Sequence, residues 1–417
     1  LAFVLAPVLV PLLAPGLGEA TGQQTELRAL AVELTRVMLI SPLFFGISGM
    51  LTGILNARQH FLAPAIAPVL YNLGIILAAV FLSGPLGVHG LAWGVAGGAA
   101  AHLLVQAPAL RSVGMRWRPS LDLGSEAVMD VLRLMGPRVV GLAATQVNFL
   151  VVVFFASFVS DEAISVMNYA FLMMMLPVGV IGMAISTAVF PTLAAHAAAH
   201  ETAALRTAIS STLRVILFLS IPASVGLVLL AEPAVRLLLE RGAFDATATD
   251  RVVQALSIYA LGIAAQAGIE ILSRGFYALS DTRTPVAIAV IAMAVNIAFA
   301  ALLVQPFGLG GLAGAGALSA LLEFGLLVRL LDVRVGGLDR RPLRRSMGST
   351  VIASVVMAQV VIIVRLLLGS AGMDSGEAFG ALGHIVISGG LGALVFVAIS
   401  GALNREDYAL VMRRLGR

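Results

Sequence analysis

The octapeptide Pro85-Leu-Gly-Val-His-Gly-Leu-Ala92 returns as Pro306-Phe-Gly-Leu-Gly-Gly-Leu-Ala313, with five of its eight positions identical. The offset that connects Pro85 with Pro306 also connects Pro64 with Pro285, each of which opens an apolar run after a short polar loop. One Pro/Gly match would be weak, but two matches at one offset favour an internal repeat. We therefore expect two six-helix halves in parallel orientation, an architecture found in transporters.

The composition indicates a membrane protein. The chain has 417 residues, of which 59% are hydrophobic and 12% charged, and its mean hydropathy is +1.01. Soluble globular proteins carry about 25% charged residues, so this chain lacks the polar residues that would cover a water-exposed surface. We predict an all-α polytopic membrane protein. The absence of cysteine excludes disulfides, thiolate metal ligands and cysteine nucleophiles.

Apolar runs of roughly 20 residues, the length that crosses the hydrocarbon core as a helix, recur along the chain. The first run is too short to cross, so we interpret it as the end of a helix that begins upstream. The twelve expected helices are 1–15, 30–55, 62–83, 91–109, 134–158, 164–194, 214–231, 252–273, 285–305, 311–329, 350–369 and 381–402.

The loops between these runs alternate in charge. One set contains 19 of the 26 arginines, counting Arg214 and Arg329 at helix ends, and the alternate set contains four. Because cytoplasmic loops are enriched in arginine and lysine, we expect the first set and the C-terminus in the cytoplasm. This placement also accounts for the basic residues without a nucleic-acid partner.

Charges inside the apolar runs are costly, at least about 2.5 kcal/mol each at the bilayer centre, and they mark candidate functional positions. Glu33 and Arg36 are i, i+3 neighbours that form either a local ion pair or part of a cavity lining. Arg138 either snorkels or lines a cavity, and Arg365, near an outer helix end, is expected to snorkel. Glu323 is the only acidic residue on its helix. It is either protonated, paired with a residue of another helix, or functional.

Gln266, Glu270 and Arg274 follow one another at i, i+4 spacing and share one helix face. Such a polar stripe faces protein or a water-filled cavity. It is either part of a cavity or gate, or a structural ion pair between Glu270 and Arg274. Asn148 and Asn296 lie near mid-helix, where hydrogen bonds between helices are the commoner role. We keep all five as candidates for a substrate path.

Motifs for hydrolytic chemistry are missing from the sequence. There is no GxxxxGK[ST] phosphate loop, no intramembrane HExxH and no GxSxG. His196 and His200 have a spacing that suits a metal, but no third ligand accompanies them, and we interpret them as a solvated helix face. Energy for any transport would then come from an ion gradient, the membrane potential or the substrate gradient.

Four segments resemble the MurJ/MviN family of lipid II flippases. The similarity extends over essentially the whole chain, from the family's third helix to its fourteenth. The segments are Gly53–Asn72 (GILNARQHFLAPAIAPVLYN), Gly114–Pro119 (GMRWRP), Met135–Pro137 (MGP) and Arg274–Pro285 (RGFYALSDTRTP).

The resemblance implies the two-lobe, MATE-like helix bundle of the MOP (multidrug/oligosaccharidyl-lipid/polysaccharide) exporter superfamily, with about twelve of the family's fourteen helices here. Residues 1–111 and 134–331 would form the lobes, and 112–133 a cytoplasmic connector. An extra helix pair at 350–402 would line a lipid-facing groove, followed by a cytoplasmic tail at 403–417. On the same resemblance, two further helices would precede the chain.

The implied function is transport of lipid II, an undecaprenyl-pyrophosphate-linked peptidoglycan precursor, from the inner to the outer leaflet of a bacterial plasma membrane by alternating access. The implied partners are lipid II, membrane lipid and cell-wall synthesis proteins. No cofactor or resident metal is implied, and the coupling ion is unknown.

Three positions depart from the family pattern. An arginine on the family's eighth helix is replaced by Leu172, and the acids of sodium-binding members correspond to Val152 and Ala300, although Asn296 remains. Sodium coupling through that site is therefore not expected. The alternatives are an exporter of another lipid-linked oligosaccharide, a drug exporter of the same superfamily, a scaffold that does not transport, and a membrane glycan-processing enzyme. A glycan-processing enzyme would be expected to have acidic or histidine clusters in its loops, and the loops of this chain have none.

Overall fold

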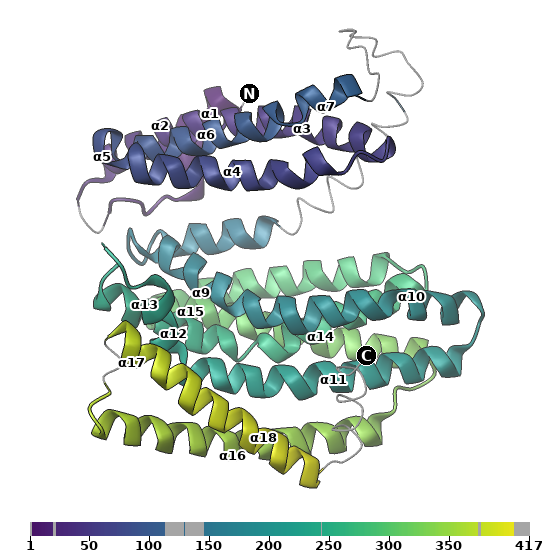
Figure 1. Cartoon of the computed structure of the whole chain (residues 1–417). Coiled ribbons are helices and arrows are strands. Elements are labelled where there is room, and N and C mark those ends of the chain that lie inside the picture. Colours follow the sequence, from purple (N-terminus) through teal and green to yellow (C-terminus); the bar gives the residue numbers. More distant parts are fainter. Residues whose placement is uncertain are drawn as a thin grey trace. The chain divides into compact units, whose positions relative to one another are not determined.

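The chain folds into membrane-spanning helices, as its hydropathy predicts. The computed structural model in Figure 1 describes residues 2–19, 22–112, 129, 146–242, 244–373 and 377–403, and every regular element within them is a helix. Among these residues, eight helices are long and apolar enough to cross a membrane, and a bent helix pair makes a ninth candidate. In lipid a helix satisfies its own backbone hydrogen bonds, which is why apolar runs adopt this form. The protein is a multi-pass membrane protein.

The first of two compact units comprises Leu1–Val140. A Cβ on Gly74 of α4 would lie 2.7 Å from the Cα of Gly98 on α6, so glycine lets these two helices pack backbone to backbone. The helices of this unit are α1 (Ala2–Leu13), α2 (Gln24–Met38), α3 (Ile40–Ala57), α4 (Leu62–Phe81), α5 (Ser83–Leu86), α6 (Val88–Leu104) and α7 (Ala107–Ser112).

The second unit comprises Gly141–Arg417. It contains the helix Gln146–Ala156, which follows residues outside the described ranges. Its other helices are α9 (Ala163–Pro177), η1 (Val178–Met183), α10 (Ala184–Ala198), α11 (Thr202–Leu229), α12 (Ala231–Leu239), α13 (Ala246–Ala260), α14 (Ile263–Ala278), α15 (Arg283–Arg334), α16 (Arg340–Ser370), α17 (Ala378–Gly383), η2 (His384–Ser388) and α18 (Gly389–Leu403).

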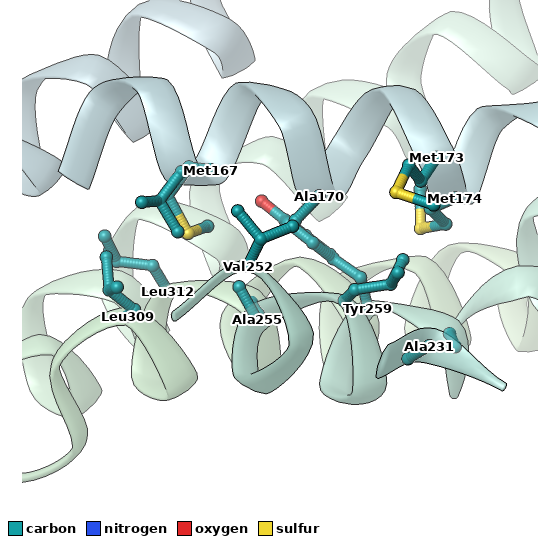
Figure 2. Close-up of a cluster of buried hydrophobic side chains, with 14 of the residues drawn as sticks. Met167, Ala170, Met173, Met174, Ala231, Val252, Ala255, Tyr259, Leu309 and Leu312 are labelled. Carbon is teal, nitrogen blue, oxygen red and sulfur yellow. The ribbon is translucent and has the colours of Figure 1, made fainter. Parts of the chain in front are cut away.

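One buried core of the second unit lies between α9, α13 and α15, and another lies between α11, α14 and α15. Figure 2 shows Met167, Met173 and Met174 of α9 opposite Val252 and Tyr259 of α13, all of them buried. A separate cluster joins α16 and α18 to α11 through Phe218, Met357 and Phe396, among others. The C-terminal helix pair therefore packs on α11 of its own unit.

The internal repeat is present in the backbone as well as in the sequence. Gly87 has φ 55° and ψ −139°, and Gly308, its counterpart in the second copy, has φ 53° and ψ −127°, a conformation that favours glycine. Gln59 and Ser280 share the same offset and the same φ of 59°. The helices on either side also correspond, since α3 ends at Ala57 and α14 at Ala278. The prediction of a repeat is confirmed by these local matches.

Helix ends depart from the predicted limits because hydropathy detects only the apolar middle of a helix. The expected loop 195–213 is largely helical, with α10 continuing to Ala198 and α11 beginning at Thr202. The expected outer loop 232–251 contains most of α12 and the start of α13. Alanine, leucine and arginine, which have high helix propensity, extend the helices past the apolar runs. The two runs 285–305 and 311–329 lie in α15, on either side of the break at Gly308.

Candidate functional site

A cavity of about 510 Å³ lies within the second unit, among the helix Gln146–Ala156, α9, α13, α14 and both halves of α15. Apolar and aromatic side chains, including Phe149, Phe171 and Tyr259, form most of its wall. The predicted path residues that line it are Asn148, Gln266, Asn296 and Glu323. Other polar groups on the wall are Gln146, Asn168 and Ser319.

Asn148 and Asn296 meet across this cavity wall. The Asn296 amide Nδ2 donates to Asn148 Oδ1, joining the helix Gln146–Ala156 to α15, and Asn296 is 3% exposed. The predicted role of these amides as hydrogen bonds between helices is confirmed for this pair. Because each amide has polar capacity left after this bond, the pair also presents polar atoms to the cavity.

The same region does not fit the sodium site that the family resemblance raised. Val152 lines the cavity with an apolar side chain, and Ala300 is 3% exposed in an apolar cluster. Alkali cations in proteins need several oxygen ligands, with carboxylates to balance their charge, and these two positions supply no side-chain oxygen. Within the described residues, no group of three or more His, Asp or Glu side chains is arranged to hold a metal ion.

Glu323 is the only charged residue among those found to line the cavity. It extends from the second half of α15 toward the wall that Gln266 of α14 also forms. Glu270 and Tyr277 on α14 lie near enough to Glu323 to act on it electrostatically, and the Glu270 carboxylate repels that of Glu323. Glu323 is the only acidic residue of its apolar run, as the sequence indicates. In space, however, it lies near the polar residues of α14.

Arg274 joins α14 to α10 at the end of α14 that leads into α15. Its Nη1 lies 2.6 Å from Glu270 Oε2 and donates to the Glu270 carbonyl at 3.0 Å, and Nη2 donates to Thr187 Oγ1 at 3.0 Å. About 21% of the Arg274 side chain is exposed. The predicted i, i+4 ion pair is confirmed, and the contact with Thr187 adds a tie to a second helix. Nothing in the sequence pointed to Thr187.

The remaining predicted site residues lie elsewhere. Glu33 does not pair with Arg36, so the predicted local ion pair is wrong: Glu33 Oε2 lies 3.3 Å from His89 Nε2 of α6. Arg36 donates to the Phe3 carbonyl at 3.3 Å and stacks over the Phe3 ring. Each side chain finds a closer partner on a neighbouring helix than along its own. Arg138 lies outside the described residues.

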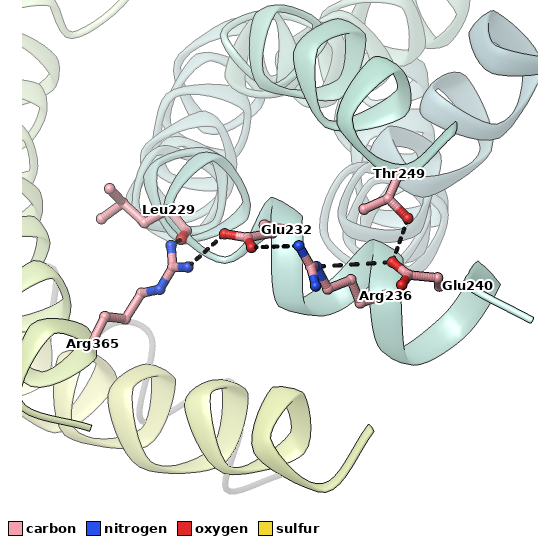
Figure 3. A network of polar contacts seen from close by, with 6 residues as sticks. All are labelled: Leu229, Glu232, Arg236, Glu240, Thr249 and Arg365. Carbon is pink, nitrogen blue, oxygen red and sulfur yellow. Dashed lines mark hydrogen bonds and ion pairs between the residues drawn. The ribbon is translucent and has the colours of Figure 1, made fainter. Parts of the chain in front are cut away.

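Arg365 of α16 is bound by partners at the end of α11 and on α12. Figure 3 shows its guanidinium bound to the Leu229 carbonyl and to Glu232, whose carboxylate oxygen accepts at 3.0 Å. Arg236 bridges Glu232 and Glu240 on α12, with distances of 3.2 and 3.8 Å. This network ties α16 to α12 and shares no residue with the cavity wall.

A MurJ profile, described as "Lipid II flippase MurJ", matches residues 1–373. A probable lipid II flippase MurJ of Vibrio cholerae is 34% identical over 312 residues, covering 74% of this chain and 59% of that relative. The lipid II flippase MurJ of Burkholderia cenocepacia is 36% identical over 270 residues, covering 63% of this chain and 52% of that relative. The chain thus spans between half and two thirds of the length of these relatives.

Two solved structures share the fold. A lipid II flippase MurJ in an inward closed conformation superposes with a TM-score of 0.78 at 23% identity, covering 97% of this chain and 80% of that one. An inward-facing multidrug resistance MATE family transporter of the MOP superfamily gives a TM-score of 0.65 at 18% identity, covering 80% and 79%. The predicted MOP-type helix bundle is confirmed.

Proposed function

The chain belongs to the MurJ family of lipid II flippases, and we propose that it moves lipid II from the inner to the outer leaflet of a bacterial plasma membrane. The observation that carries this proposal is the family match over residues 1–373 of a multi-pass helical protein. On this proposal the protein is a transporter and not an enzyme. Its arginine-rich loops and C-terminus face the cytoplasm.

A lipid-linked pyrophosphate poses a specific physical problem. Its headgroup carries about two negative charges, which lose their hydration in the apolar core unless cationic groups replace it. The prenyl tail has no such cost and stays in lipid throughout. On this proposal the tail follows the helix pair α16 and α18, which packs on α11 through an apolar cluster.

Arg274 is our candidate for the first contact with the headgroup. It stands at the end of α14 that this topology puts at the cytoplasmic surface, next to the loop that carries Asp281. Glu270 and Thr187 hold its guanidinium in place before substrate arrives. A phosphate would replace Glu270 as the partner, because the planar guanidinium binds carboxylate and phosphate in the same bidentate geometry.

The proposal is tested by lipid II binding to the purified chain, measured by native mass spectrometry in detergent. We expect one lipid II per chain, with binding at least about tenfold weaker for Arg274→Ala, since charge-assisted hydrogen bonds are worth about 1.5–3 kcal/mol. Arg274→Lys should recover only part of the loss, because lysine cannot form the bidentate contact.

Arg241→Ala is the matched control. Arg241 is an exposed arginine that donates to the Leu237 carbonyl next to α12, and its removal changes net charge equally. It should leave binding unchanged. Undiminished binding by Arg274→Ala would remove this residue from the substrate path, and failure of the unmodified chain to bind lipid II would contradict the proposed substrate.

A further inference from the structure

The cavity of the second unit has a charge opposite to that needed by the transported lipid. We propose that it is a binding site for a hydrophobic organic monocation, such as an aromatic or alkyl ammonium or phosphonium ion, with Glu323 as the counter-ion. This inference is independent of the proposed transport of lipid II, because it concerns a second ligand and another set of residues.

Size and lining suit a small organic molecule. The volume of about 510 Å³ falls within the range of roughly 300–1,000 Å³ that small-molecule sites occupy. Such sites combine a mostly apolar wall with a few placed polar groups. Here the wall comes from helical segments that are far apart in sequence. Its polar groups are the Asn148–Asn296 pair, Gln146, Asn168, Gln266, Ser319 and Glu323.

The charge of the wall selects a cation. Among the described lining residues, Glu323 is the only one with a formal charge, and none is basic. On the neighbouring α14, Arg274 is already paired with Glu270 at 2.6 Å, so that pair adds no net charge. A carboxylate in a largely apolar cavity is costly unless a counter-ion accompanies it. An anionic headgroup would be repelled here.

The wall also favours an organic cation over a metal ion. Phe171 and Tyr259 both line the cavity, with their ring centroids 6.2 Å apart, and the faces of such rings attract cations. Met167, Met174 and Met293 add flexible thioether side chains that adapt to irregular ligands. A multivalent metal ion would need more carboxylates than the single one, Glu323, that the described lining residues supply.

The test uses tetraphenylphosphonium and tetraphenylborate, which have nearly the same shape and opposite charge. Equilibrium dialysis of the purified chain in detergent should show saturable binding of one tetraphenylphosphonium per chain. Tetraphenylborate should show only the non-saturable uptake of the detergent micelle. Bound tetraphenylphosphonium should also raise the melting temperature, since a ligand that binds the folded state stabilises it.

Glu323→Gln keeps the shape of the side chain and removes its charge. It should weaken tetraphenylphosphonium binding at least about tenfold, as loss of a buried charge partner does. Ala289→Trp is a second variant: Ala289 is an exposed residue on the cavity wall, so the indole fills the space without burying a new group in the core. It should abolish binding with no change of charge.

Glu201→Gln removes an exposed carboxylate that contacts His196 between α10 and α11, and it should leave binding unchanged. The proposal is overturned if Glu323→Gln and Ala289→Trp bind tetraphenylphosphonium as tightly as the unmodified chain. It is also overturned if tetraphenylborate saturates the same site, which would indicate a purely apolar pocket. Displacement of the probe by millimolar sodium would instead identify a site for an inorganic cation.

Discussion

Gly311 shows how one residue in the repeat determines the path of the chain. A Cβ at this position would overlap with the carbonyl oxygen of Leu303, and a Cβ on Gly90 would overlap with that of Leu82 in the first unit. The two contacts are equivalent, because the offset of the repeat relates both of their members. Only glycine lets the chain fold back so closely after the break at Gly308.

Gly311→Ala is therefore expected to lower the free energy of unfolding by about 1–3 kcal/mol, the usual cost of overpacking. Gly325→Ala is the control on the same helix, because nothing lies within 4 Å of its added Cβ. Melting curves recorded by circular dichroism in detergent compare the two. Equal melting temperatures for Gly311→Ala and the control would show that the backbone adjusts at no cost.

Asp281 makes the loop between α14 and α15 sensitive to acid. It accepts hydrogen bonds from the Thr284 hydroxyl at 2.7 Å, the Thr284 amide at 3.0 Å and Arg334 at 3.1 Å. These bonds, with those from Thr284 dominant, lower the pKa of Asp281 to about 2 from 3.8. The folded-state pKa is thus below the unfolded one, so the stabilisation is present above about pH 4 and is lost as pH falls toward 2.

Asp281→Asn should consequently melt at a lower temperature than the unmodified chain at pH 6, and the difference should shrink between pH 4 and pH 2. Thermal denaturation across this range measures it. The Thr284→Val variant removes the hydroxyl donor and keeps the amide. Its melting temperature should differ less from that of the unmodified chain than that of Asp281→Asn does, with the same dependence on pH. A gap that stays constant down to pH 2 would mean that the charge of Asp281 is not involved.

At the scale of elements, the polar network around Arg365 adds to the attachment of α16. Arg365 reaches from α16 to Glu232 and to the end of α11, and 25% of its side chain and 34% of that of Glu232 are exposed. A partly exposed pair of this kind contributes less than a buried one, because water screens it. Hydrophobic packing of Met357 and Val361 of α16, in one buried cluster with Phe218 of α11, must supply most of the remaining attachment.

A double-mutant cycle with Arg365→Met and Glu232→Gln measures this contact. We expect a coupling energy of about 0.5–1 kcal/mol, and a larger loss for Arg365→Met alone than for the pair of changes, because Glu232 then loses one of its partners. Hydrogen exchange should increase at the end of α16 that carries Arg365. Additive effects of the two changes would show that the contact contributes nothing to stability.

The elements were largely predictable from the sequence, whereas the cavity was not. The long helices could be predicted from hydropathy and run length alone, and the breaks between them from the glycines and prolines of the repeat. Asn148, Gln266 and Glu323 each stood out as polar residues in apolar runs, but their common wall depends on how distant helices pack. Thr187 carried no signal at all, because a threonine on a helix is ordinary until Arg274 reaches it.

At the scale of the whole molecule, the repeat pairs positions of different chemistry. Glu323 corresponds through the repeat to His102, and His102 binds Ser48 Oγ at 2.7 Å within the first unit. Ser48 in turn accepts from Gln106 at 2.7 Å, so this network joins α3 and α6. The equivalent place in the second unit opens instead onto the cavity. Equivalent positions of the repeat thus carry a polar residue that is hydrogen-bonded to a neighbouring helix in the first unit and one that lines a cavity in the second.

The orientation of the molecule is tested best on α16, which spans Arg340–Ser370 and has four arginines at its start and a single one, Arg365, near its end. Since arginine-rich ends stay in the cytoplasm, Arg341 should face inward and Ala371, just past the other end, outward; both are exposed. The chain has no cysteine, so Arg341→Cys and Ala371→Cys can each be labelled singly with an impermeant maleimide.

In intact cells only Ala371→Cys should react, and Arg341→Cys should react after the membrane is disrupted. Reaction of both in intact cells would mean that α16 does not cross the membrane. The reverse pattern would invert every loop of the chain, and it would move Arg274 to the outer surface. A headgroup arriving from the inner leaflet would then not reach Arg274 first, so this labelling also bears on the gate assigned to that residue.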